Sequence, residues 1–389
     1  MRKKTLCIMA LAICATMAQA ADFITFKRNA TTDIELTGTN DTITYDPQDW
    51  KGVHIAVRNL RQDLKAVTGN ETAPIIVGTV GKSKLAKKYK KQAKELEGKW
   101  EQYLIFMDNG KLVILGSDKR GTIYGIYELS QQIGVSPWYW MADAPIAKHD
   151  KLFAKSGSYT DGEPKVKYRG IFINDEWPSF GTWCSNQFGG INSKAYARIF
   201  ELMLRLKANY FWPAMWDSRF NEDDTYSPQM ADEMGIVMGT SHHEPMMRAH
   251  KEYVYRKDSI GAWDYATNKA NLDRFFEEGL ERNKNFDNLI TIGMRGDGDV
   301  AMGKGDDEDN MKTLRDVVDG QREIIERVYK RPASEVPQLW AIFTEVQRYY
   351  DAGFTVPDDV TLLFCDNNWG YIRRTGPEKE RSRKGGMGM

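Results

Sequence analysis

The second half of this chain alternates short apolar segments with longer amphipathic ones, and this alternation limits the folds open to it. In the pattern at 193–207, apolar side chains recur on one helical face. Alternating strands and helices form parallel sheets with right-handed crossovers, so the sequence predicts an α/β fold. The expected strands are 168–174, 208–212, 236–240, 289–293, 338–343 and 360–365, and the expected helices are 193–207, 228–234, 268–284 and 307–330.

The ends of the six expected strands favour a barrel over an open sheet. Each strand runs into acidic, histidine, arginine or tryptophan residues, as where 289–293 is followed by Met294–Asp299. A (β/α)₈ barrel of the TIM type gathers all its strand C-termini on one face, whereas an open sheet concentrates function at one switch point. We therefore expect a catalytic barrel over 161–389. Since six units fall short of eight, either strands escape this pattern or the barrel is truncated at its C-terminus.

The segment before the barrel reads as a small α/β domain over 21–160. A strand is expected at 74–78, and two strands flank Asp108-Asn109-Gly110, which is a strong hairpin signal. A Lys- and Glu-rich helix is expected within 82–100 and another helix at 121–133. The turn-rich stretch 156–164 is the expected domain boundary.

Residues 1–20 have the pattern of a secretory signal peptide. A basic start is followed by an apolar stretch and by Ala18-Gln19-Ala20. We expect cleavage after Ala20 and a secreted or periplasmic protein. The apolar stretch is too short to span a membrane.

Charge and cysteine content exclude several classes of protein. The 54 Lys and Arg residues balance 54 Asp and Glu residues, which argues against a nucleic-acid partner. Cys184 and Cys365 remain after the signal peptide, and we expect two unpaired thiols. The sequence lacks the spacing of a structural zinc site, so we expect no metal, and it contains no Gly-rich phosphate fingerprint.

Acidic residues at the strand ends are candidates for catalysis. A glycosidase needs two carboxyl groups, one to protonate the leaving oxygen and one to act as base or nucleophile. For any single acid, a helix N-cap or a surface ion pair is the alternative interpretation. The candidate acids are Asp175, Glu176, Asp297, Asp299, Glu345 and Asp366.

Other polar and aromatic strand-end residues fit a sugar ligand. His242 is expected to reach a sugar hydroxyl or carboxylate, because the spacing of His242-His243-Glu244 is not that of a zinc motif. Arg295 is expected to act as a fork for a carboxylate. Trp212 and Trp216 fit stacking on a sugar face or packing in the core equally well.

Several long motifs of the chain resemble those of glycoside hydrolase family 115. They occur in the family's order, and the resemblance covers essentially all of the mature chain but only the N-terminal part of the family's architecture. The motifs are Pro137–Asp143, Tyr168–Glu176, Trp212–Trp216, Gly239–Met246 and Asp366–Gly370.

The resemblance implies an exo-acting, inverting α-glucuronidase without a cofactor. Such an enzyme releases (4-O-methyl-)glucuronic acid linked α-1,2 to xylose, so glucuronoxylan or its acidic oligosaccharides are the expected partners. Carried over by motif, Glu345 and Asp299 become the catalytic pair, with Glu345 favoured as the acid. The residues implied to line the sugar pocket are Asp175, Trp216, His242, Arg295, Asp366 and Asn368.

Three departures from the family pattern keep an alternative open. The most important is that the family continues past the C-terminal Gly-Gly-Met-Gly stretch into a further barrel segment and further domains. Phe343 stands where the family usually has a tyrosine, and Asn367 stands where an acid is common. The alternative is a truncated, non-catalytic remnant that binds carbohydrate. A hexosaminidase-like glycosidase is a third hypothesis, and a homodimer is not excluded by the sequence.

Overall fold

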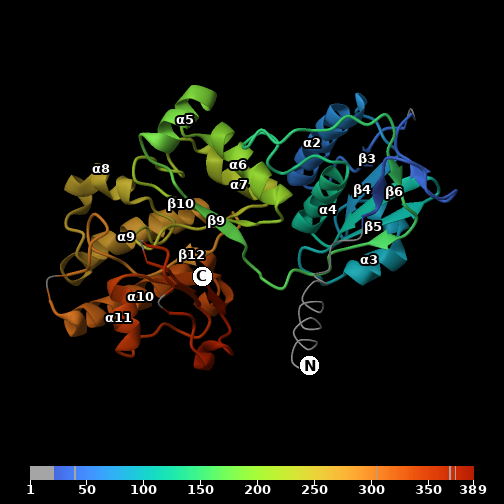
Figure 1. Cartoon of the computed structure of the whole chain (residues 1–389). Helices are drawn as coiled ribbons and strands as arrows, with labels where there is room; N and C mark the ends of the chain where they lie inside the picture. The colour runs from blue at the N-terminus through green and yellow to red at the C-terminus, as the bar shows by residue number, and fades with distance from the viewer. Residues whose placement is uncertain (1–21, 39–40, 304, 368, 373) are drawn as a thin grey trace, which may run out of the picture. The chain divides into compact units, whose positions relative to one another are not determined.

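The computed structural model describes residues 22–38, 41–303, 305–367, 369–372 and 374–389 (Figure 1). The expected signal peptide at 1–20 lies outside these residues. The chain divides into two compact units. The first extends to Arg169 and includes Glu201–Ala208 and Glu233–Gly235, and the second contains the rest.

A five-stranded mixed sheet forms the centre of the first unit, in the order β3-β4-β6-β5-β8. β3, β4 and β6 are parallel, whereas β5 runs antiparallel to both β6 and β8. The predicted hairpin joins β5 to β6, and its turn residues Asn109 and Gly110 have φ values of 48° and 76°. The strands are β3 (Thr44–Tyr45), β4 (Ile75–Thr79), β5 (Tyr103–Asp108), β6 (Lys111–Gly116) and β8 (Ser158–Tyr159).

Helices cover this sheet, and its strands bury side chains toward both faces. Val113 and Leu115 of β6 belong to an apolar cluster with Leu96 of α3, whereas Ile114 meets Gly125 of α4. The predicted helix within 82–100 is broken into η1 and α3, and a long helix that the sequence did not indicate, α2, packs on α4. The helices are α2 (Lys51–Thr68), η1 (Leu85–Lys88), α3 (Lys90–Leu96) and α4 (Lys119–Gln132).

A second, three-stranded antiparallel sheet in the first unit has the order β1-β7-β2. Its central strand β7 pairs Ala154 with Ile24 on one side and with Ile34 on the other. The strands are β1 (Ile24–Thr25), β2 (Ile34–Glu35) and β7 (Phe153–Ala154).

Among its described residues, the second unit contains seven parallel strands that follow one another in sequence order. One sheet runs β9-β10-β11 and the other runs β12-β13-β14-β15. A parallel bridge between Met238 and Asn288 links the end of the first sheet to the start of the second. The strands are β9 (Gly170–Asn174), β10 (Tyr210–Ala214), β11 (Val237–Met238), β12 (Ile290–Thr291), β13 (Gln338–Ile342), β14 (Thr361–Phe364) and β15 (Met387–Gly388).

All six expected strands of this half are present, and a seventh, β15, lies beyond the last expected strand. The four expected helices correspond to α6, α7, α9 and α10, while the other three had no clear sequence signal. The mixed α/β architecture is therefore as expected. The helices are α5 (Ser179–Phe188), α6 (Ser193–Arg205), α7 (Tyr226–Met234), α8 (His250–Ile260), α9 (Tyr265–Asn283), α10 (Asp307–Tyr329) and α11 (Glu345–Asp351), with short turns η2 (Ala333–Glu335) and η3 (Glu378–Glu380).

Two smaller expectations can be compared with the structure. Cys184 is a buried free thiol and Cys365 is a half-buried one, as the sequence indicated. Among the described residues, every helix is too short or too polar to cross a lipid bilayer.

Candidate active site

The two candidate catalytic acids are carried by loops that follow neighbouring strands. Asp299 lies in the loop after β12, and Glu345 is the first residue of α11, directly after β13. Because β12 and β13 are parallel and adjacent, their C-terminal ends lie at the same edge of the sheet. The two acids, which are 46 positions apart in the sequence (345 − 299), therefore meet at one end of the strands.

Arg295 connects the two acids. Its Nε and Nη2 donate to Glu345 Oε1 and Oε2 at 2.9 and 2.7 Å, a bidentate pair. Its Nη1 donates to the backbone oxygen of Asp299 at 2.7 Å and also contacts Asp299 Oδ1. The fork that the sequence assigned to a substrate carboxylate is thus bound here to protein carboxylates.

The charges around the pair keep both carboxyl groups ionised at neutral pH. Burial opposes ionisation of Asp299, but the hydrogen bond from His242 and the nearby charges outweigh it and lower the pKa of Asp299 to about 2. For Glu345, burial is likewise outweighed by hydrogen bonds from Arg295 and Thr344, so its pKa lies below its ordinary value. The Arg295 guanidinium therefore pairs with both carboxylates and favours the ionised form of each.

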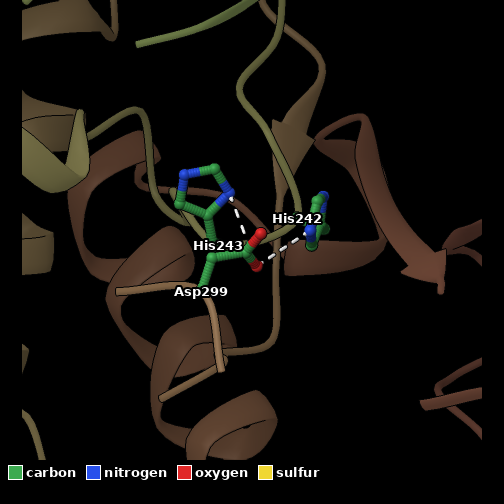
Figure 2. A group of neighbouring side chains, drawn as sticks. All are labelled: His242, His243 and Asp299. Carbon is green, nitrogen blue, oxygen red and sulfur yellow. Dashed lines mark ion pairs between the residues drawn. The ribbon is translucent and has the colours of Figure 1, made fainter. Parts of the chain in front are cut away.

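His242 and His243 extend from the turn after β11 toward Asp299 (Figure 2). His242 Nε2 lies 3.0 Å from Asp299 Oδ1, and His243 Nδ1 lies 3.8 Å from the same oxygen. Among the described residues these three form the one group of His, Cys, Asp or Glu side chains close enough to hold a metal. However, Arg295 already contacts Asp299 Oδ1, and its positive charge opposes a divalent cation there. The arrangement fits a hydrogen-bonded network better than a metal site.

Aromatic rings enclose the histidines. Trp216 is 36% exposed and stacks on His243, with ring centroids 4.7 Å apart. The ring of His242 contacts that of Phe343 at 4.8 Å and lies 6.5 Å from that of Trp212. Trp216 is thus the predicted pocket residue whose ring is both held by the protein and open to a ligand.

Asp175 lies away from solvent. Its side chain is fully buried, and its Oδ2 accepts hydrogen bonds from Tyr196 and from Ser218, the latter at 2.7 Å. Burial raises the pKa of Asp175 to about 7 despite these hydrogen bonds. No face of Asp175 is accessible to a ligand in this structure. Its role in substrate binding therefore stays a prediction.

A cavity of about 220 Å³ opens at the ends of β13 and β14. It contains Asp366, an exposed predicted pocket residue, and the ring of Phe343 that contacts His242. Asn368, the remaining predicted pocket residue, lies outside the described residues. The cavity is lined by Ile342, Phe343, Thr344, Gln347, Cys365, Asp366, Asn367 and Trp369.

Two residues of the site were missed by the sequence analysis. Thr344 donates its hydroxyl to Glu345 Oε2 at 2.6 Å and adopts a φ of 50°, which is strained for a β-branched residue. Ser241 lies within hydrogen-bonding distance of both His242 and His243. The sequence offered one signal for Thr344 and Ser241: each directly precedes a residue that the motifs had singled out. Strained backbone collects at functional sites, and Asp299 also has a positive φ, of 63°.

Comparison with known families accounts for both units. Residues 161–389 match the model of glycosyl hydrolase family 115, and residues 28–129 match the N-terminal model of glycosyl hydrolase family 67. No curated protein matches the chain.

Among solved structures, a family 115 4-O-methyl-α-glucuronidase with specificity for decorated arabinogalactans superposes with a TM-score of 0.83 and 35% identity. The match covers 94% of this chain and 49% of that enzyme, so the chain spans about half of its relative's length. A family 20 β-N-acetylhexosaminidase from Streptomyces coelicolor A3(2) shares the fold at a TM-score of 0.55 and 10% identity, over 91% of this chain and 70% of its own. The chitobiase of Flavobacterium johnsoniae does so at 0.52 and 12%, over 88% and 53%. By its family model and by its likeness to the glucuronidase, this chain belongs to glycoside hydrolase family 115.

Proposed function

We propose that this chain is an exo-acting, inverting α-glucuronidase that releases (4-O-methyl-)glucuronic acid α-1,2-linked to xylose in glucuronoxylan. The observation that carries the proposal is the placement of Asp299 and Glu345 on two sides of the Arg295 guanidinium. Family membership and the glucuronidase likeness support the reaction class. Because that relative is described as specific for decorated arabinogalactans, such side chains are the second candidate substrate.

The fold that we propose for the second unit is a (β/α)₈ barrel. Its seven parallel strands occur in sequence order, from β9 to β15, without the reversal that marks the switch point of a doubly wound sheet. One more strand between β15 and β9 would make eight. This arrangement would bring all the strand-end loops, and with them both acids, to one face.

The partners of the two acids favour Asp299 as base and Glu345 as acid. The hydrogen bond from His242 and the nearby charges hold the pKa of Asp299 at about 2, so it stays ionised, as a base that accepts a proton from water must. Glu345 is ionised because of Arg295, and a glucuronate carboxylate would compete for that guanidinium. Once Arg295 pairs with the sugar, burial of Glu345 would raise its pKa and favour the protonated acid.

The proposed reaction is a single displacement. Water attacks the anomeric carbon while the bond from that carbon to the leaving oxygen breaks. Asp299 takes one proton from the water, and Glu345 gives its proton to the leaving oxygen. The products are the free uronic acid, with its anomeric configuration inverted, and the xylosyl residue with its 2-hydroxyl group restored.

We further propose that the protein acts outside the cytoplasm, as a secreted or periplasmic enzyme. The basic and apolar residues 1–20 and the small residues at Ala18 and Ala20 support this location. A polymeric substrate fits it, because glucuronoxylan does not enter the cell intact.

The test is product analysis on acidic xylo-oligosaccharides and on decorated arabinogalactan in parallel. We expect acidic sugar whose first-formed anomer is β, read by proton NMR, and none from a Glu345→Gln variant. Release of neutral sugar would favour a hexosaminidase-like reaction, and binding without release would favour the non-catalytic alternative. Release only from arabinogalactan would move the substrate to the second candidate.

A further inference from the structure

The cavity at the ends of β13 and β14 contains one charged side chain among its described lining residues, that of Asp366. Asp366 is exposed, and its carboxylate makes no hydrogen bond or ion pair with the described residues. The side-chain amide of Gln347 also has no hydrogen-bond partner among them. A carboxylate accepts hydrogen bonds, and an amide both donates and accepts them. This cavity therefore has the chemistry to bind a ligand rich in hydroxyl groups.

A uronic acid is a poor ligand for this cavity. Its carboxylate is an anion, and the described lining offers the anion of Asp366 and no cation. The basic residues of the site instead contact the ring of Phe343, His242 at 4.8 Å and the guanidinium of Arg295 at 6.0 Å from the ring centroid. Neither of them lines the cavity, whereas Phe343 does. Phe343 is thus shared by the basic side of the site and by a cavity suited to a neutral sugar.

Thr344 joins this cavity to the proposed acid. It lines the cavity, and its hydroxyl donates to Glu345 Oε2 at 2.6 Å. The carboxyl oxygen of the acid is therefore one hydroxyl away from the cavity. In an inverting glycosidase the acid protonates the leaving oxygen, while the base activates a water on the opposite face of the sugar ring. The leaving sugar belongs on the side of Glu345, which is also the side of the cavity.

Trp369 adds an apolar surface to the same cavity. The residue lines the cavity and is 81% exposed, so one face of its indole is open to a ligand. Asn367 Oδ1 accepts hydrogen bonds from the backbone N–H groups of Trp369 and Tyr371, both at 3.0 Å, which holds the loop that carries the ring. The cavity itself, about 220 Å³, is smaller than the pockets of drug-sized ligands and suits a single sugar ring. Trp369 is then placed to stack on the next sugar of an oligosaccharide.

We propose that this cavity is the subsite for the neutral sugar that leaves, with Asp366 and Gln347 binding its hydroxyl groups and Trp369 stacking on the adjoining sugar. That this sugar is the leaving one rests on the proposed function, whereas the preference for a neutral sugar rests on the charge of the lining. Asp366 would then contact the leaving sugar, and the uronate would lie on the side of Arg295.

Kinetics on two substrates with the same uronic acid test the subsite. One substrate is xylotriose that carries the uronic acid, and the other is an aryl α-glucuronide, which has no leaving sugar. Gln347→Leu should lower kcat/KM about tenfold on the first substrate and stay within about threefold of the wild type on the second. Gln131→Leu, the same substitution at an exposed position of α4, is the control and should change neither value. Equal losses on the two substrates, or no loss on the oligosaccharide, would overturn the assignment to the leaving sugar.

Ligand binding gives a second readout that does not need turnover. Saturation-transfer NMR should detect wild-type binding of neutral xylotriose or galactotriose, and Trp369→Ala should lose that signal while its signal with free glucuronic acid is unchanged. A wild type that binds neither trisaccharide, or a loss of glucuronic acid binding in Trp369→Ala, would overturn the proposal. If the wild type binds a neutral trisaccharide but releases no acidic sugar, the proposed function fails and the neutral-sugar site stands.

Discussion

Two ion clusters in the second unit hold their carboxylates in different ways. In the site cluster, formed by Arg295, Asp299 and Glu345, one guanidinium holds two carboxylates. In the helix cluster, centred on α8 and α9, the carboxylate of Glu252 is held by two guanidiniums, Arg248 at 2.5 Å and Arg282 at 2.9 Å. These two guanidiniums also pair with Glu278 and Glu222, so cations are not in excess there.

The balance of charge differs between the two clusters. Glu252 is fully buried and also accepts from the backbone N–H of Ala249 at 3.2 Å, so it has no capacity left for a ligand. The site cluster carries an excess negative charge, which favours the positive, oxocarbenium-like transition state of glycoside hydrolysis. An ion cluster with excess anion at a strand end is therefore suited to catalysis, whereas a charge-balanced one between helices is suited to stability.

Replacing Glu345 should have the largest effect. Glu345→Gln keeps the shape of the side chain but removes the transferable proton, so kcat should fall by about 10³-fold or more. Release of acidic sugar measures the loss, and circular dichroism checks the fold. Activity within tenfold of the wild type would remove Glu345 from the catalytic pair.

Replacing Glu252 should produce the reverse pattern. Glu252→Gln removes the fully buried anion that Arg248 and Arg282 share, which should lower the free energy of unfolding by about 3 kcal/mol. Urea titration measures this change, and kcat per folded molecule should not change. The control is Glu281→Gln, which breaks an exposed pair with Lys284 and should cost below about 1 kcal/mol. Equal losses in the two variants would contradict the structural role of the helix cluster.

The pH dependence of stability tests the same comparison, because the pKa of Asp175 is raised whereas those of the acids in the site cluster are lowered. The folded protein holds the Asp175 proton up to about pH 7, whereas an unfolded aspartate loses it near pH 4. Its contribution to stability is thus complete below about pH 4 and is lost as the pH rises toward 7, by up to about 4 kcal/mol. Thermal unfolding at a series of pH values should show this decline in the wild type and a flatter profile in Asp175→Asn. Parallel profiles would mean that Asp175 is ionised in the folded state.

The smallest effect is expected at the start of α10. Asp306 accepts hydrogen bonds from the backbone N–H groups of Glu308 and Asp309, both at 3.0 Å. Asp306→Ala should therefore lower the free energy of unfolding by about 1 kcal/mol and leave kcat unchanged. Glu308→Ala, two positions later and exposed, is the control that keeps the cap. A drop in kcat for Asp306→Ala would show that the cap also supports the site.

The sequence predicted the parallel strands better than the contacts of the site. Strands such as β10 and β13 stand out as apolar runs, whereas β15 consists of Met387 and Gly388 and is defined by backbone pairing with β14. The short helix α11 escaped because seven residues give too little periodicity.

Strand ends located both acids, because parallel topology alone brings those ends together. The sequence pattern did not reveal the partners of Arg295, since the choice between a substrate carboxylate and Glu345 depends on distances that no pattern encodes. Nor did it single out Ser241, because its contacts come from the angle between two rings and one hydroxyl.

The first parallel strand has a consequence for the behaviour of the protein in concentrated solution. β9 pairs with β10 and, among the described strands, with no other. Its side chains Ile171 and Phe172 are 40% and 57% exposed. A bare strand edge with apolar side chains is a template for another chain. β9 is therefore the edge at which a further strand would pair, and a lysine at position 172 should weaken that pairing.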